Sequence, residues 1–236
     1  MVIAARRIEF LGVEIDESGI MLQEHIIEKV QKFPEKLIDK KQLQSFLGVV
    51  NFAGMFIKNL AKHRKVFSPL LKKDVPFIWK DEHSQALNQL KEVCRNLPKL
   101  AIPQDEDDLV LYTDASDYWW AAVLTKVTPT GDEPCRYCSG LFTKEKAARW
   151  HINEKEFYAV RKAFKKWPLF LLAKKFTLKV DNSQVKAFLR NKIESKPEKA
   201  RLLRWQAECQ YYVFDIVNIK SHENILADFL TRDGQG

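Results

Sequence analysis

Two stretches of the chain differ in the spacing of their hydrophobic residues. Between residues 24 and about 98, apolar side chains recur every three or four positions, which predicts amphipathic helices, including one over 82–97. Residues 7–22 contain two apolar runs separated by Asp16-Glu17-Ser18-Gly19, and this arrangement predicts a β-hairpin. The first stretch is therefore expected to be mainly helical, with a hairpin at its start.

The second stretch, from residue 105, predicts a mixed α/β fold. Residues 109–113 are apolar on both sides, as expected of a central strand that is covered on both faces. The elements expected after it are strands 119–126 and 136–142, helix 153–171, strand 176–180, helices 183–190 and 199–210, strand 213–219 and helix 224–230. This order predicts a five-stranded mixed sheet with flanking helices. We therefore expect two domains, 1–104 and 105–236.

Composition limits the class of protein without identifying it. The 236 residues are 46% hydrophobic, and the net charge of +8 suits a nucleic-acid partner without requiring one. No apolar run approaches the roughly 20 residues that a membrane-spanning helix needs, and no signal-peptide pattern follows Met1. Four cysteines are too few for a disulfide framework in a chain of this length, so a reducing intracellular compartment is expected.

Four carboxylates fall where the predicted sheet and helices would converge. Asp114 and Asp181 end predicted strands, Glu156 lies in the first turns of the long helix, and Asp228 lies in the last helix. Each alone could be a helix cap or a surface charge. Together they would repel one another unless cations were bound, and ligands that are all oxygen favour Mg²⁺ or Mn²⁺ over zinc. Two such ions can stabilise both the attacking and the leaving oxygen of a phosphodiester cleavage.

Several segments resemble the ribonuclease H domains of LTR-retroelement polymerases. They are Tyr112-Thr113-Asp114-Ala115-Ser116, residues 153–160, Val180-Asp181-Asn182 and residues 224–232. The amino-acid sequences of residues 135–140, 151–156 and 204–207 narrow the resemblance to plant pararetroviruses of the caulimovirus, badnavirus or tungro bacilliform type. The first stretch resembles the same polyproteins, with Phe10, Leu11 and Gly12 similar to a primer grip and residues 43–52 similar to the thumb.

The resemblance implies an RNase H-like five-stranded sheet, preceded by a thumb-like region, and it assigns roles to residues. Asp114, Glu156, Asp181 and Asp228 would be the catalytic set and would hold two Mg²⁺ ions, with Mn²⁺ as a substitute. Glu154 competes for the glutamate role, and Glu156 is preferred because residues 157–159 match the family after it. His222 would assist product release, or would be a helix-start or surface histidine. Nucleic-acid contacts are expected from Ser116, Ser139, Asn182, Ser183, Arg204, Lys62 and Lys65.

The implied function is a metal-dependent endonuclease that hydrolyses the RNA strand of RNA–DNA hybrids during viral reverse transcription, leaving a 3′-hydroxyl and a 5′-phosphate. No Tyr-x-Asp-Asp polymerase motif is present, so the chain is expected to be a fragment of a larger polymerase. Its expected partners are the hybrid, the primer-template and the upstream fingers and palm of the same polyprotein. No membrane partner is expected, and the expected location is the host cytoplasm or the virion.

Other interpretations fit the sequence less well than a ribonuclease H. An integrase shares the fold, but Ile216 stands 35 residues after Asp181, where an integrase carries its glutamate. A catalytically silent hybrid-binding or scaffold subunit is disfavoured because all four carboxylates are present. Cys135 and Cys138 form a CxxC without a second pair nearby, which is typical of two strand cysteines rather than a zinc site.

Overall fold

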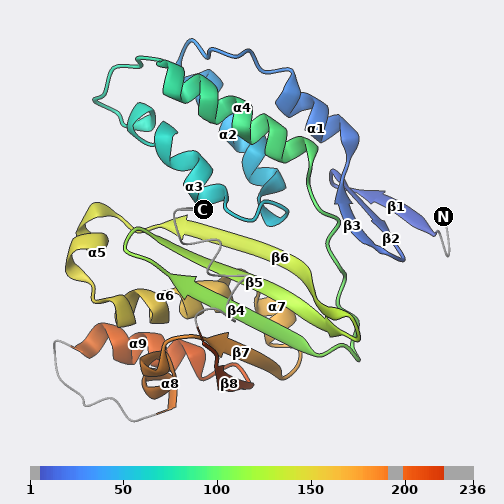
Figure 1. The fold of residues 1–236 in the computed structure, drawn as a ribbon, viewed down its shortest axis with the longest axis vertical. Helices are drawn as coiled ribbons and strands as arrows, with labels where there is room; N and C mark the ends of the chain where they lie inside the picture. Colours follow the sequence, from blue (N-terminus) through green and yellow to red (C-terminus); the bar gives the residue numbers. More distant parts are fainter. Residues whose placement is uncertain (1–5, 191–198, 221–236) are drawn as a thin grey trace. The chain divides into compact units, whose positions relative to one another are not determined.

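The computed structural model describes residues 6–190 and 199–220, and these divide between Ile102 and Pro103 into two compact units (Figure 1). The first unit begins with a small antiparallel sheet and continues with helices. Its elements are β1 (Arg7–Phe10), β2 (Val13–Asp16), β3 (Gly19–Leu22), α1 (Glu24–Gln31), α2 (Lys40–Phe52), η1 (Ala53–Met55), α3 (Leu60–Arg64), η2 (Lys65–Phe67), η3 (Pro69–Leu71) and α4 (Asp81–Arg95).

The predicted hairpin over residues 7–22 is a sheet of three strands in the order β1-β2-β3. The first apolar run of this hairpin, from Ile8 to Ile15, was expected to be one continuous strand, and this was wrong. The chain reverses at Leu11 and Gly12, which adopt φ values of 47° and 82°. Positive φ at both central residues is typical of the tight turns that join antiparallel strands. A Cβ atom at Gly12 would lie 2.9 Å from the Phe52 ring, so this turn requires glycine there.

The helices of the first unit enclose an apolar core, as their spacing predicts. Phe46 of α2, Phe67 of η2 and Leu87 of α4 are fully buried. The end of this unit returns to the small sheet, because the backbone amides of Ile20 and Leu100 donate to each other's carbonyl oxygens at 2.8 and 3.0 Å. The helix predicted over 82–97 is α4, which begins one residue earlier and ends two residues earlier.

The second unit is built on a five-stranded mixed sheet in the order β6-β5-β4-β7-β8. β4 pairs antiparallel with β5 and parallel with β7, which itself pairs parallel with β8. The elements of this unit are β4 (Leu109–Ala115), β5 (Trp119–Thr128), β6 (Gly131–Leu141), α5 (Lys144–Arg149), α6 (Ile152–Lys166), α7 (Pro168–Leu171), β7 (Phe176–Val180), α8 (Ser183–Arg190), α9 (Ala200–Cys209) and β8 (Phe214–Asn218). The predicted mixed α/β class with a five-stranded mixed sheet is confirmed, and the short α5 was not anticipated.

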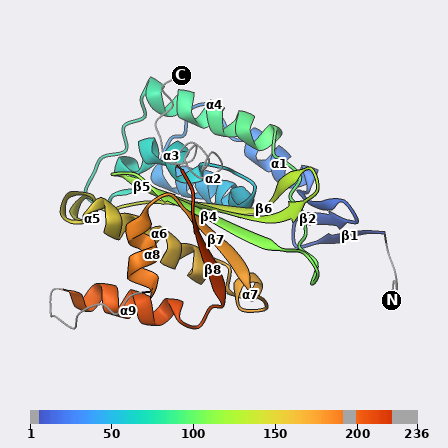
Figure 2. The same ribbon diagram turned by 60° about the horizontal axis from the view of Figure 1, so that its bottom comes forward.

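Helix α6 forms the centre of the layer that covers this sheet. It packs against β4 and β5, while α8 and α9 pack against it on the same side of the sheet (Figure 2). Phe157, Val160 and Phe164 share one side of the helix and are buried, as predicted. The single helix expected over 153–171 is divided, because Pro168 has no amide hydrogen and Trp167 leaves the helical conformation. The helix predicted over 224–230 lies outside the described residues.

Aromatic packing fixes α9 against Trp150 and α6. Trp205 of α9 is buried, with its ring centroid 5.2 Å from that of Trp150 and 5.9 Å from that of Phe157. The Arg201 guanidinium lies over the rings of Trp150 and Trp205, at 4.7 and 5.5 Å from the centroids. Trp205 is therefore a core residue, as its position on an amphipathic helix predicts.

Cys135 and Cys138 are buried, unbridged residues of β6.

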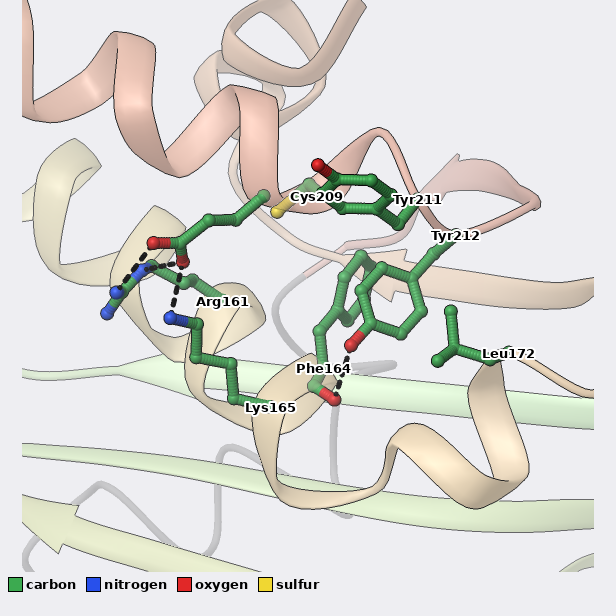
Figure 3. A pocket seen from close by; sticks show the side chains of 8 residues that line it. Arg161, Phe164, Lys165, Leu172, Cys209, Tyr211 and Tyr212 are labelled. Carbon is green, nitrogen blue, oxygen red and sulfur yellow. Dashed lines mark hydrogen bonds and ion pairs between the residues drawn. The ribbon is translucent and has the colours of Figure 1, made fainter.

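A cavity of about 270 Å³ opens where α6 meets the end of α9 (Figure 3). Phe164, Leu172 and Tyr212 line its apolar part, and the Tyr212 hydroxyl donates to the Phe164 carbonyl at 3.0 Å. At its charged side the Glu208 carboxylate accepts from Arg161 Nε at 2.6 Å and lies 2.8 Å from Lys165 Nζ. This ion-pair network joins α9 to α6.

No helix in the described part of the chain is long and apolar enough to cross a membrane.

Candidate metal centre and nucleic-acid interface

Asp114 lies near the end of the central strand of the second unit. Every residue of β4 is buried, and Asp114 is only 5% exposed. Its backbone pairs with Ala121 of β5, so the carboxylate is held on a strand with neighbours on both sides. A buried aspartate on a rigid strand has a fixed direction, which is what a metal ligand requires.

Glu156 comes from the start of α6, where local capping determines how the helix begins. The Glu154 carboxylate accepts from the His151 amide at 3.1 Å, and His151 Nδ1 accepts from the Asn153 amide at 3.4 Å. This reciprocal arrangement is a capping box. Because α6 packs on β4 and β5, the next turn places Glu156 against the sheet, where it is 5% exposed.

Asp181 follows β7 directly, at the junction with α8. The side chain of the next residue, Asn182, accepts from the Gln184 amide at 2.9 Å and so caps α8. The Asn182 amide group also donates to the Asn153 side-chain oxygen at 2.9 Å. The bond to Asn153 connects the segment carrying Asp181 to the start of α6, which carries Glu156.

The structure brings three of the four predicted carboxylates together. One oxygen atom from each of Asp114, Glu156 and Asp181 can be chosen so that all three lie within 4.8 Å of one another. Such proximity of like charges is unfavourable unless a cation or proton compensates for it. Because every donor is a carboxylate oxygen, the set fits a hard divalent cation better than zinc.

The two competing glutamates of α6 have different surroundings. Glu154 forms the helix cap and an ion pair with Arg201 of α9, whereas Glu156 belongs to the acidic cluster. The geometry therefore favours Glu156 for the metal-binding role. Asp228 and His222 lie outside the described residues, so their predicted roles remain predictions.

The predicted nucleic-acid contacts fall into several places. Ser116 closes the β4–β5 turn, since its hydroxyl accepts from the Trp119 amide at 3.3 Å. Ser139 lies opposite Ala121, which lies opposite Asp114, so Ser139 shares a face of the sheet with Asp114 at a distance of about 10 Å, two strand spacings. Asn182 and the exposed Ser183 begin α8, next to Asp181.

The remaining predicted contacts come from α9 and from the first unit. Arg204 is exposed on α9. Lys62 and Lys65 belong to α3 and η2 of the first unit. Phe10 and Leu11 are 60% and 75% exposed at the turn that Gly12 completes.

Sequence reasoning missed two residues around the cluster. Asn153 holds the Asp181 segment, and its place three residues before Glu156, on the same side of a helix, was a usable signal. Lys155 is 2% exposed and pairs with Asp117 at 2.9 Å. Nothing in the sequence indicates its burial, because a lysine in a charged helix usually faces solvent.

Comparison with known proteins gives the relationship of this chain. Residues 79–178 match the family described as "RNase H-like domain found in reverse transcriptase". The chain is 41% identical over 228 residues to the enzymatic polyprotein of Figwort mosaic virus (strain DxS), and 38% identical over 232 residues to that of Cauliflower mosaic virus (strain D/H). These alignments cover 96% and 97% of this chain but 34% of each relative, so the chain spans about a third of their length.

Solved structures show the same fold. A foamy viral protease–reverse transcriptase in complex with double-stranded DNA superimposes with a TM-score of 0.76 at 22% identity, over 92% of this chain and 45% of that one. The complex of the foamy viral enzyme with an RNA/DNA hybrid gives a TM-score of 0.77 at 20% identity, over 98% of this chain and 31% of that one. The fold is therefore RNase H-like, as predicted, and the sequence matches confirm the predicted kinship: the chain is a relative of the caulimovirus enzymatic polyproteins, and its residues 79–178 match the RNase H-like domain found in reverse transcriptase.

Proposed function

We propose that the second unit is a metal-dependent endonuclease that cuts the RNA strand of RNA–DNA hybrids during viral reverse transcription. The observation that carries the proposal is the meeting of Asp114, Glu156 and Asp181, which come from three separate elements, with carboxylate oxygens within 4.8 Å. A fold alone does not define a reaction. A buried acidic cluster in an RNase H-like domain of a viral polyprotein supports this reaction in particular.

The chain's own groups would prepare the site for the reaction. Asp114, Glu156 and Asp181 would hold two divalent ions, with Asp228 as a further ligand. When bound, the ions would activate water and stabilise the leaving 3′-oxygen. The buried strand and helix keep the Asp114 and Glu156 carboxylates in place before substrate arrives, so little reorganisation is needed. The products would carry a 3′-hydroxyl and a 5′-phosphate.

Recognition of the hybrid would depend on polar groups around the cluster. Asn182 and Ser183 at the start of α8, with Ser116 and Ser139 near Asp114, would contact the minor groove. There the 2′-hydroxyls distinguish RNA from DNA. Arg204 would contact phosphate. Ser116, Asn182 and Ser183 are assigned because they follow the segments that carry Asp114 and Asp181. Ser139 is assigned because it shares a face of the sheet with Asp114, and Arg204 because it is an exposed cation.

The first unit would hold the duplex and, in a complete polymerase, the primer strand. Phe10 and Leu11 are exposed apolar residues at a tight turn with Gly12, which suits a primer grip formed by these three residues. Lys62 and Lys65 would neutralise phosphates in a thumb-like region. The partners would be primer-template and the upstream fingers and palm of the same polyprotein, in the host cytoplasm or the virion.

The proposal is tested by incubating the chain with an end-labelled RNA–DNA hybrid in Mg²⁺, Mn²⁺ or EDTA. Single-stranded RNA and duplex DNA serve as substrate controls. We expect metal-dependent cutting of the hybrid's RNA strand only. Asp114→Asn should abolish cutting while leaving hybrid binding largely intact, because it removes a ligand without changing the size of the side chain.

Asp215→Asn is the matched control variant, since Asp215 is an exposed aspartate of β8 outside the cluster. It should cut at the wild-type rate. Cutting by Asp114→Asn at the wild-type rate would show that the metal-site assignment is wrong. Hybrid binding without any cutting by the wild-type chain would instead favour a catalytically silent binding subunit.

A further inference from the structure

We propose that Lys155 and Asp117 are positioning residues that hold Asp114 and Glu156 in register for metal binding. Lys155 Nζ lies 2.9 Å from Asp117 Oδ1. Lys155 directly precedes Glu156 on α6, and Asp117 follows Asp114 by three residues, in the β4–β5 turn. The ion pair thus joins the two segments that carry these carboxylates. The inference rests on the proposed function, because it concerns the same metal site.

Lys155 and Asp117 differ strongly in burial. The Lys155 side chain is 3% exposed, whereas that of Asp117 is 76% exposed. Lysine is almost never fully buried unless it is paired, and Lys155 is the one buried lysine within residues 6–190 and 199–220. Its stem therefore crosses the packed region between helix and sheet, and its ammonium group meets the turn at Asp117. Removing Asp117 would leave a buried positive charge without this partner.

The turn that receives the ammonium group is itself well defined. The Ser116 amide donates to the Trp119 carbonyl at 2.9 Å, and the Ser116 hydroxyl accepts from the Trp119 amide at 3.3 Å. A rigid turn transmits the position of Asp117 to Asp114, which lies just before it on β4. The pair therefore fixes the end of β4 against the start of α6.

Lys155 completes a set of contacts made by four consecutive residues of α6. Each of them reaches a different part of the second unit: Asn153 bonds Asn182, Glu154 pairs with Arg201, Lys155 pairs with Asp117, and Glu156 joins the acidic cluster. The first turns of α6 thus bring the α8 start, α9 and the β4–β5 turn to one place. Glu156 approaches Asp114 itself in the cluster, and the Lys155 pair adds an ion pair to the β4–β5 turn that follows Asp114.

The test compares Asp117→Asn with the wild-type chain by two measurements. Titration calorimetry with Mn²⁺ measures metal affinity without any reaction, and cleavage of a labelled hybrid is followed across a range of Mg²⁺ concentrations. Loss of a residue that orients a metal ligand typically weakens metal binding by about 10- to 100-fold. We expect Asp117→Asn to raise the Mn²⁺ dissociation constant and the half-saturating Mg²⁺ concentration about tenfold. The rate at saturating Mg²⁺ should change far less.

Two further variants separate positioning from general damage to the fold. Asp117→Glu keeps the charge and should restore most of the metal affinity. Lys155→Met removes the buried charge without creating a cavity, so the variant should fold. Its half-saturating Mg²⁺ concentration for cleavage should nevertheless be higher than that of wild type. Asp215→Asn is the control, because it breaks a comparable pair, Lys175–Asp215 at 2.6 Å, elsewhere in the second unit.

The outcomes distinguish this inference from the proposed function. If the wild-type chain binds Mn²⁺ and cuts hybrid while Asp117→Asn matches it in both, the positioning role is wrong and the proposed function stands. If Asp117→Asn changes only the KM for the hybrid, the positioning role is also wrong, because Asp117 would then contact substrate. If neither the wild-type chain nor the variant cuts hybrid, but Asp117→Asn binds Mn²⁺ more weakly than wild type, the positioning role is supported and the proposed reaction is wrong. If the wild-type chain binds no Mn²⁺, both are wrong.

Discussion

The side-chain amide of Asn182 donates a 2.9 Å hydrogen bond to the side-chain oxygen of Asn153. This single contact joins the residue after Asp181 to the helix turn before Glu156. The two carboxylates belong to segments that are far apart in the sequence, so their separation depends on contacts of this kind. The bond is therefore a sensitive place to test how the acidic cluster is assembled.

Asn153→Ala should slow hybrid cleavage without unfolding the chain. A hydrogen bond of this type contributes about 1 kcal/mol, which corresponds to roughly a fivefold loss of rate if it acts in full on the site. The measurement is the initial cleavage rate at fixed Mg²⁺. Asn218→Ala, at an exposed position of β8, is the control. An unchanged rate in Asn153→Ala would mean that this bond does not position Asp181.

Binding of a divalent cation should stabilise the second unit against heat. The repulsion between carboxylates within 4.8 Å is relieved by a cation, and a ligand that binds only the folded state raises Tm. We expect Mn²⁺ to raise Tm by a few degrees, on the order of 2–4 °C per kcal/mol, and EDTA to reverse the shift. Glu156→Gln should lose most of the shift. A full shift in Glu156→Gln would place the bound ion elsewhere.

The Glu208 network predicts a loss of stability in acid. Hydrogen bonding to Arg161, with a further contribution from Lys165, lowers the pKa of Glu208 from 4.5 to about 2. A carboxylate with a lowered pKa in the folded state stabilises the protein above its unfolded pKa of about 4.5. That contribution disappears as the pH falls from about 4.5 towards 2. Solvent screens the pair, because the Glu208 side chain is 35% exposed, so we expect about 1 kcal/mol.

Urea unfolding at pH 7, 4 and 3 measures this contribution. Glu208→Gln should be less stable than wild type at pH 7 and should approach it at pH 3. Glu133→Gln, at an exposed glutamate of β6, is the control and should follow the wild-type curve. Equal stability of Glu208→Gln and wild type at pH 7 would show that the network contributes nothing measurable.

His83 predicts a second effect of pH, in the first unit. Its Nδ1 accepts from the Lys80 amide at 2.8 Å at the start of α4, and burial lowers its pKa below 6.5. The neutral form is therefore favoured in the folded state, so this contribution is present above about pH 6.5 and is lost as the pH falls below it. Hydrogen exchange of the amides of residues 80–84, corrected for intrinsic rates, should accelerate at pH 5 relative to pH 7.5. His83→Gln should not show this acceleration.

Gly140→Ala tests how closely β6 approaches Trp120. A Cβ at Gly140 would lie 2.4 Å from Trp120 Nε1, so the indole or the strand must shift. Overpacking of this kind costs about 1–3 kcal/mol, which chemical denaturation can measure. Gly48→Ala is the control, because a Cβ there meets nothing within 4 Å and alanine suits helix α2. It should be neutral or slightly stabilising.

Local patterns were sufficient to predict most elements. The apolar spacing of Phe157, Val160 and Phe164 predicted α6, and the uninterrupted apolar run over 109–113 predicted a central strand, because burial on one or two faces dictates these periods. The failures lie at breaks in such patterns. The reversal at Leu11 and Gly12 depends on positive φ values, and the break at Trp167 depends on where Pro168 ends the helix.

The sequence by itself determined the mixed α/β class, the kinship with viral polyproteins and the identity of the candidate carboxylates. The sequence preferred Glu156 over Glu154 only by resemblance, and the tertiary structure gave the physical reason. Glu154 and Glu156 are two residues apart and so point to different sides of α6, and the packing of that helix on β4 and β5 gives one the cap and the other the site. The burial of Lys155 against Asp117 was equally undetermined by sequence, because the pair spans 38 positions and forms only when helix and turn pack together.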